Sequence, residues 1–158
     1  MPGGDYSAIR GELLDGLVRG IDHVGVCVAN LDEAGRAWSA LLGRPAVDRE
    51  DVASLQTSAV FLRMAEPGAV ELVCPMPNNP GLTRFLGSRG DALHHIAFAV
   101  TDIRTALARL LEAGVPVIDR EARRGAGGHL VAFIHPKAMG GTLVELVERT
   151  SQRTEGQP

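Results

Sequence analysis

The feature that most constrains the fold of this 158-residue chain is an internal repeat. Residues 21–28 have a strand-like pattern, and the amphipathic helical pattern that follows them ends near Gly43. Residues 93–100 repeat the strand pattern 72 positions later (95 − 23 = 72), and a second helical pattern then ends near Gly114. A repeat of this length indicates two copies of one supersecondary unit that share a core.

The two halves also agree at the ends of their helical patterns. Asn30 and Asp102 occupy equivalent positions and are favourable N-cap residues, and Gly43 and Gly114 suit the position that follows a helix. Strand-like segments follow at residues 56–64 and 69–74 in the first half and at residues 116–118, 129–134 and 142–148 in the second. Each half therefore predicts a βαβββ module, and the whole chain predicts an α+β fold with a mixed sheet.

The repeat sets the predicted domain boundaries. We assign residues 21–149 to one domain, with modules at 21–74 and 93–149 and a Pro- and Gly-rich linker at 75–92 that contains a short helix near 82–86. The apolar residues between positions 5 and 19 share one helical face, which predicts a short helix within an amphipathic N-terminal extension at residues 1–20. Residues 150–158 lack strong core-forming residues and predict a flexible tail.

Composition excludes several function classes. Hydrophobic residues make up 45 % of the chain and charged residues 22 %, so the chain can bury a core. The net charge of −3 argues against binding to nucleic acid or to an anionic membrane surface. Neither a secretory signal nor a membrane-spanning run is apparent, and two cysteines cannot form a disulfide framework. We therefore expect a cytoplasmic domain.

Two histidines and two glutamates lie at matched positions of the repeat. His23 and His95 occupy the same place in the first strand of each half, and Glu71 and Glu145 lie in the last strand of each half. The His-to-Glu separations are 48 (71 − 23) and 50 (145 − 95), so a pseudo-twofold axis would bring all four residues together. This ligand set suits one Co²⁺, Mn²⁺, Fe²⁺, Ni²⁺ or Zn²⁺ ion better than Ca²⁺.

The strand period supports an inward orientation of these side chains. His23, Gly25 and Cys27 share one face of their strand, whereas the other face is aliphatic and is expected to pack under the helices. Glu145 is an isolated acid within an apolar strand, where an unpaired carboxylate would be costly to bury. A bound metal ion would remove that cost.

Other polar residues have weaker signals. His94 points away from His95 by strand alternation, so we expect a supporting or structural role for it, and we expect His129 at a rim or on the surface. Residues 123–128 combine two arginines with three glycines, which fits either a loop that closes over a phosphate-bearing ligand or an ordinary hairpin turn. Lys137 is the only lysine beside 15 arginines, and it is either a point charge at a site or a surface residue.

Five motifs together resemble the methylmalonyl-CoA epimerase family of the vicinal oxygen chelate superfamily. They are Ile-Asp-His-Val-Gly at 21–25, Leu-His-His-Ile-Ala-Phe at 93–98, Gly-Ala-Gly-Gly at 125–128, Val-Ala-Phe-Ile-His-Pro-Lys at 131–137 and Gly-Thr-Leu-Val-Glu-Leu at 141–146. The resemblance covers about residues 21–149 and is strongest from Gly81 onward.

The resemblance implies a U-shaped cavity formed by two βαβββ modules around one divalent metal ion. It implies His23, Glu71, His95 and Glu145 as metal ligands, with Glu145 also acting in catalysis. It further implies an acyl-CoA or other acyl thioester substrate and a homodimer. For substrate contacts we expect Ala59, Arg63, Arg124, Gly127, Gly128 and Lys137.

One departure from the family pattern concerns proton transfer. Members of the family pair the carboxylate equivalent to Glu145 with a second Glu, and our alignment places Ala59 at that position. Because alanine cannot transfer a proton, Glu50, Asp51 or a water molecule would have to replace it. The departure leaves open a different metal-dependent isomerase, lyase or dioxygenase on the same scaffold. A metal-free binding protein fits less well, because all four ligands are retained.

Overall fold

The computed structural model describes residues 6–151 of the chain. Within these residues, no helix has the length and apolar character that crossing a membrane requires.

The first module contains one helix and four strands. Its elements are β1 (Val18–Cys27), α1 (Leu31–Leu42), β2 (Ala46–Val52), β3 (Thr57–Arg63) and β4 (Ala69–Pro75). Asn30 caps α1 by accepting a hydrogen bond from the Glu33 N–H, and Gly43 ends the helix in a left-handed conformation. Both ends of α1 therefore match the sequence prediction.

The second module repeats this order after a connecting helix. The connecting helix is α2 (Pro80–Arg89), and the module consists of β5 (Ala92–Val100), α3 (Ile103–Glu112), β6 (Arg123–Arg124), the 3₁₀ turn η1 (Ala126–Gly128), β7 (Leu130–Ile134), the 3₁₀ turn η2 (Pro136–Met139) and β8 (Leu143–Glu148). Asp102 caps α3 through the Thr105 N–H. The predicted α+β fold of two βαβββ modules is confirmed.

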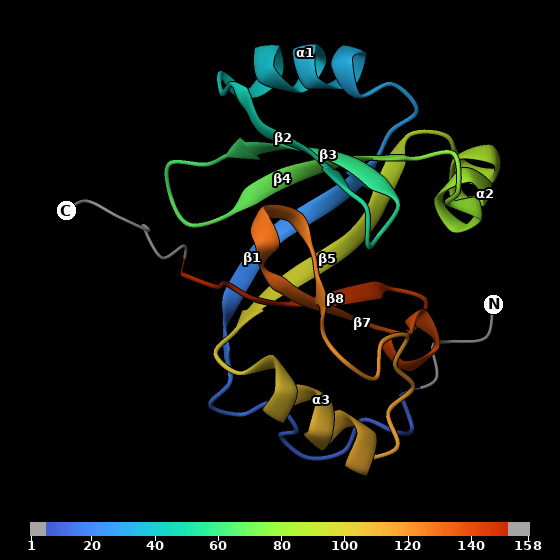
Figure 1. The fold of residues 1–158 in the computed structure, drawn as a ribbon. Helices are drawn as coiled ribbons and strands as arrows, with labels where there is room; N and C mark the ends of the chain where they lie inside the picture. The colour runs from blue at the N-terminus through green and yellow to red at the C-terminus, as the bar shows by residue number, and fades with distance from the viewer. Residues whose placement is uncertain (1–5, 152–158) are drawn as a thin grey trace.

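All eight strands belong to one mixed sheet with the order β2-β3-β4-β1-β5-β8-β7-β6. Within each module the first and last strands are parallel, and the modules join through the antiparallel pair β1–β5 at the centre. Figure 1 shows α1 and α3 at opposite ends of the molecule, with the curved sheet between them. The inner face of the sheet surrounds a cavity, as the resemblance implied.

The aliphatic faces of the first strands pack under the helices, as predicted. Val26 and Val28 of β1 lie in one apolar cluster with Leu31 and Ala34 of α1. The equivalent cluster of the second module gathers around α3 and includes the fully buried Ile103. Because the helices occupy the outer face of the sheet, the inner face is left free for the polar residues.

The predicted N-terminal helix is wrong for the described residues. Residues 6–17 form turns, because Gly11 and Gly16 adopt φ angles of 70° and 74°, which a right-handed helix does not contain. The apolar residues of the segment nevertheless pack on the α3 cluster; they are Ile9, Leu13, Leu14 and Leu17. Residues 1–5 of the extension and 152–158 of the tail lie outside the described part of the chain.

Two strand assignments also differ from the prediction. Strand β2 was not predicted, because Ala-Val-Asp-Arg-Glu-Asp-Val is largely polar and lacks an apolar alternation. Residues 116–118 form no strand, and Val117 makes only an isolated bridge with Ile134. The strand that follows α3 in the chain is instead β6.

Candidate metal centre

The register of the sheet brings the two histidines and two glutamates together. In one row across the strands, Glu71 of β4 pairs with Gly25 of β1, which pairs with His95 of β5. In a second row, His23 of β1 pairs with Ala97 of β5, which pairs with Glu145 of β8. In each row a small residue, Gly25 or Ala97, separates a histidine from a glutamate. The four side chains meet above the seam between the modules.

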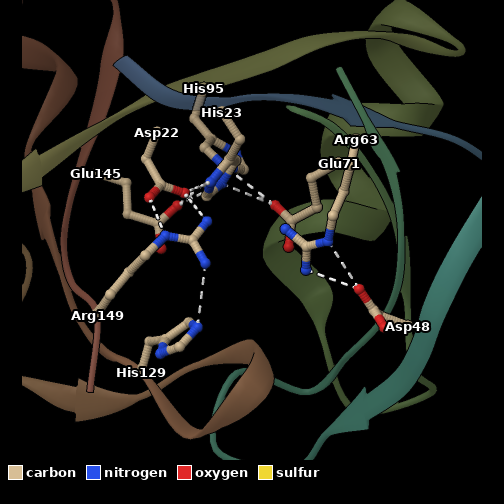
Figure 2. Close-up of polar contacts among 9 residues, drawn as sticks. All are labelled: Asp22, His23, Asp48, Arg63, Glu71, His95, His129, Glu145 and Arg149. Atoms are coloured by element: carbon tan, nitrogen blue, oxygen red, sulfur yellow. Dashed lines mark hydrogen bonds and ion pairs between the residues drawn. The ribbon is translucent and has the colours of Figure 1, made fainter. Parts of the chain in front are cut away.

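The ligand atoms of His23, Glu71, His95 and Glu145 converge on one point (Figure 2) and lie within 4.8 Å of one another. The two Nε2 atoms are 3.1 Å apart. His23 Nε2 is 3.2 Å from an oxygen of each glutamate, and His95 Nε2 is 3.2 Å from Glu71 and 3.0 Å from Glu145. All four residues are buried. These are the four residues that the repeat singled out.

This arrangement fits a divalent metal ion. Two buried carboxylates need a compensating positive charge, and two imidazole nitrogens and two carboxylate oxygens form a borderline-hard donor set. The set is the one that divalent ions of the first transition series accept. The residues present therefore fit the metal site that the fold family implies.

Without a metal ion, protons supply the compensating charge. Burial disfavours charge on His23, but hydrogen bonds to Asp22, Glu145 and Glu71 outweigh it and raise the pKa to about 11. The same balance raises the pKa of His95 to about 9. Burial would raise the pKa of Glu71, but the two histidines lower it to about 2, and they also lower the pKa of Glu145.

Each of the two histidines is held by the residue that precedes it. His23 Nδ1 donates to Asp22 Oδ1 at 2.8 Å, and Arg149 holds Asp22 through bonds of 2.7 and 3.0 Å. His95 Nδ1 lies 2.9 Å from Nδ1 of His94. Since both histidines are held through Nδ1, both Nε2 atoms face the centre where the four residues converge. The prediction that His94 points away from His95 is wrong, because β5 has an irregular register at this point and the His94 ring contacts His95 and lines the same cavity. The supporting role of His94 stays a prediction.

Sequence analysis missed two phenylalanines that flank the histidines. Phe61 of β3 pairs with Glu71, and Phe133 of β7 pairs with Glu145. Phe61 packs edge-on against the His23 ring, and Phe133 packs edge-on against the His95 ring. In both pairs the ring centroids are 5.9 Å apart. The two positions differ by 72 (133 − 61 = 72), so the repeat carried the signal that would have identified them.

The four converging residues line a cavity of about 760 Å³. Of the expected substrate contacts, Arg63 and Gly127 line this cavity. Arg63 is held by two hydrogen bonds to Asp48 (Figure 2). His129 lies at the cavity wall beside Arg149, as its expected rim position suggested.

The other expected contacts do not line the cavity. Ala59 is fully buried in an apolar cluster with Cys27 and Leu82, because the neighbouring side chains cover its short one. Arg124 folds back onto the Gly128 carbonyl oxygen at 2.6 Å, which occupies both residues within their own turn. Lys137 lies in η2 with its side chain exposed, beyond the end of β7.

A family model supports the geometric argument. Residues 22–133 match the model of the glyoxalase, bleomycin resistance protein and dioxygenase superfamily. An ethylmalonyl-CoA/methylmalonyl-CoA epimerase from Cereibacter sphaeroides is 32 % identical over 80 % of this chain and 95 % of its own length. The chain belongs to the methylmalonyl-CoA epimerase family.

Solved structures of this family share the fold. The crystal structure of a methylmalonyl-CoA epimerase from Mycobacterium tuberculosis superposes with a TM-score of 0.84 at 30 % identity, over 96 % of this chain and all of that chain. A methylmalonyl-CoA epimerase in complex with methylmalonyl-CoA and NH₄⁺ superposes with a TM-score of 0.79 at 27 % identity, over 85 % of this chain and 96 % of that chain.

Replacing Gly25 tests whether the close approach of His95 organises the centre. A Cβ atom at Gly25 would lie 2.0 Å from His95 Cε1 and 2.5 Å from Nε2, so Gly25→Ala must displace the ring. We expect Co²⁺ affinity, followed by the visible absorption of the bound ion, to fall by about 10- to 100-fold or more. Gly87→Ala is the matched control, since a Cβ there meets no atom within 4 Å. Equal Co²⁺ affinities of the two variants would contradict this account.

Metal binding should release protons. The pKa values of about 11 for His23 and about 9 for His95 mean that both imidazoles are protonated at neutral pH without metal. A metal ion displaces these protons, so we expect release of about two protons and an apparent affinity that rises with pH. Calorimetric titration with Co²⁺ in two buffers of different ionisation enthalpy measures the release. An identical binding enthalpy in both buffers would show that the imidazoles are already neutral.

Proposed function

We propose that the chain is a metal-dependent epimerase that inverts C2 of methylmalonyl-CoA or of a closely related 2-substituted malonyl thioester. Family membership makes the chain an enzyme of the racemase and epimerase class. The observation that carries the proposal is the convergence of two histidines and two glutamates in the wall of a large cavity. The acyl-CoA substrate is supported by the related epimerase that holds methylmalonyl-CoA.

The reaction requires an acidified C–H bond at C2, between a thioester and a carboxylate. His23, Glu71, His95 and Glu145 would hold a divalent ion, which would supply Lewis-acid stabilisation of the enolate charge. Glu145 contributes its carboxylate on one face of C2, where we assign it to removing or returning the proton.

Arginines in the cavity wall offer guanidinium groups to the acidic groups of a thioester substrate. Four arginines line the cavity, namely Arg49, Arg63, Arg123 and Arg149. Arg149 is engaged with Asp22 and Arg63 with Asp48, so these two are held in fixed orientations before a substrate arrives. Of the expected contacts, Arg63 and Gly127 remain in the proposal.

A cytoplasmic location and a homodimer are kept as predictions for this chain.

A second candidate is another metal-dependent enzyme of the superfamily acting on a different oxygen-chelating substrate. The apolar burial of Ala59 favours it, because our alignment places the second proton-transferring carboxylate of the family at this position. A dioxygenase fits least well, since a fourth protein ligand crowds the open positions that a facial triad provides.

Proton NMR of each C2 epimer of methylmalonyl-CoA in D₂O tests the proposal. With Co²⁺-loaded protein we expect deuterium to enter C2 and the opposite epimer to accumulate. His95→Ala should abolish both, whereas His135→Ala, whose ring caps the η2 turn outside the cavity, should retain both. Absence of C2 exchange with metal bound would rule out the epimerase and favour the second candidate.

A further inference from the structure

Inversion at C2 needs a second proton-transferring group. The enolate is planar, so a proton taken from one face must be replaced on the other face by a different acid. Glu145 belongs to the metal ligand set and faces C2 from one side only. The position at which our alignment expects a second glutamate holds Ala59, which is fully buried in an apolar cluster.

We propose that Glu50 of β2 is the second acid–base residue, an inference that rests on the proposed epimerase function. Three carboxylates line the cavity besides the two ligands, namely Asp22, Asp48 and Glu50. Asp22 is bound by His23 and Arg149, and Asp48 accepts two hydrogen bonds from Arg63. Within residues 6–151, Glu50 forms no ion pair and is therefore the cavity carboxylate available to exchange a proton.

The register of the β2–β3 hairpin directs Glu50 into the cavity. Val47 pairs with Phe61 and Glu50 pairs with Ala59, so three steps along β2 match two steps along β3. This bulge contains Asp48 at a φ of 56° and shifts the alternation of β2 by one residue. Because directly paired residues share a face, Glu50 lies on the inner face opposite Ala59. The carboxylate thus comes from β2, the strand beside the β3 position at which our alignment expected the second glutamate.

The second module holds the carboxylate in place. The Gly127 N–H donates to Glu50 Oε2 at 2.7 Å, while no described residue hydrogen-bonds to Oε1. Gly127 has a φ of 65°, and a Cβ there would lie 3.2 Å from His129 Nε2, so a glycine suits this close approach. One oxygen is therefore fixed by the η1 turn, and the other is free to take or give a proton.

The proton balance of the proposed step is simple. For one epimer, Glu50 takes the C2 proton, and the C–H electron pair moves into the enolate, with the charge on the thioester oxygen. Glu145, protonated beforehand by solvent, then gives its proton to the opposite face, and the enolate pair forms the new C–H bond. Glu50 afterwards releases its proton to solvent and Glu145 takes up another, which restores both groups. For the other epimer the two carboxylates exchange roles.

Glu50→Gln tests the assignment, because glutamine keeps the size of the side chain and an oxygen for the Gly127 N–H. We expect epimerisation to fall about 100-fold or more. Deuterium should still enter C2 with retention of configuration from the epimer whose proton faces Glu145, and should not enter the other epimer. Co²⁺ affinity, measured by calorimetry, should match that of the wild type, since Glu50 is not a ligand.

Asp51→Asn is the matched control. Asp51 is the next residue of β2, pairs with Ser58 and accepts a hydrogen bond from its hydroxyl group, and it does not line the cavity. We expect this variant to epimerise like the wild type.

Two results with Glu50→Gln would overturn the assignment while the epimerase function stands. One is epimerisation at the wild-type rate, and the other is equal loss of exchange from both epimers, which indicates a general structural effect. Absence of exchange in the metal-loaded wild type would instead remove the epimerase function itself. The experiment therefore separates failure of the Glu50 assignment from failure of the proposed function.

Discussion

Burial of two carboxylates beside two imidazoles is the constraint on which this structure depends. Ionised groups taken out of water destabilise a fold unless opposite charges or hydrogen bonds compensate them. Here the compensation is reciprocal, because the histidines lower the pKa values of Glu71 and Glu145 while the glutamates help to raise those of His23 and His95. A metal ion held by the four residues would supply the positive charge that the protons provide here.

The two-module fold supplies this centre through pairs of equivalent residues. Phe61 and Phe133 flank the histidines at matched positions, and small residues, Gly25 and Ala97, leave space for them. The modules differ in what holds each ligand. His23 is held by the carboxylate of Asp22, whereas His95 is held by His94, whose pKa falls to about 4 through burial and the nearby His95. An anionic partner makes an imidazole a stronger electron donor than a neutral one does, so the two ligands are chemically unequal.

The sequence predicted the parts of the molecule that the repeat governs. The caps Asn30 and Asp102, the first strand of each module and the four converging residues all follow from matching one half to the other. Strand β2 could not be predicted, because it is polar, carries a bulge and owes its strand conformation to pairing with β3. The prediction of an N-terminal helix is wrong because it rests on the spacing of apolar residues. It gives too little weight to Gly11 and Gly16, which adopt left-handed conformations. Propensity and spacing describe local preference, while these segments are shaped by distant partners.

The antiparallel seam between β1 and β5 has a consequence for folding. Module one contributes His23 and Glu71 to the centre, and module two contributes His95 and Glu145, so neither module alone presents more than half of the ligands. A metal ion that needs all four therefore binds the docked pair of modules and not the separated ones. By mass action, its binding free energy is added to the association of the two halves. A metal ion held by all four residues would thereby act as a cross-link between the two halves, and its removal would loosen the seam before it melts either helix-covered core.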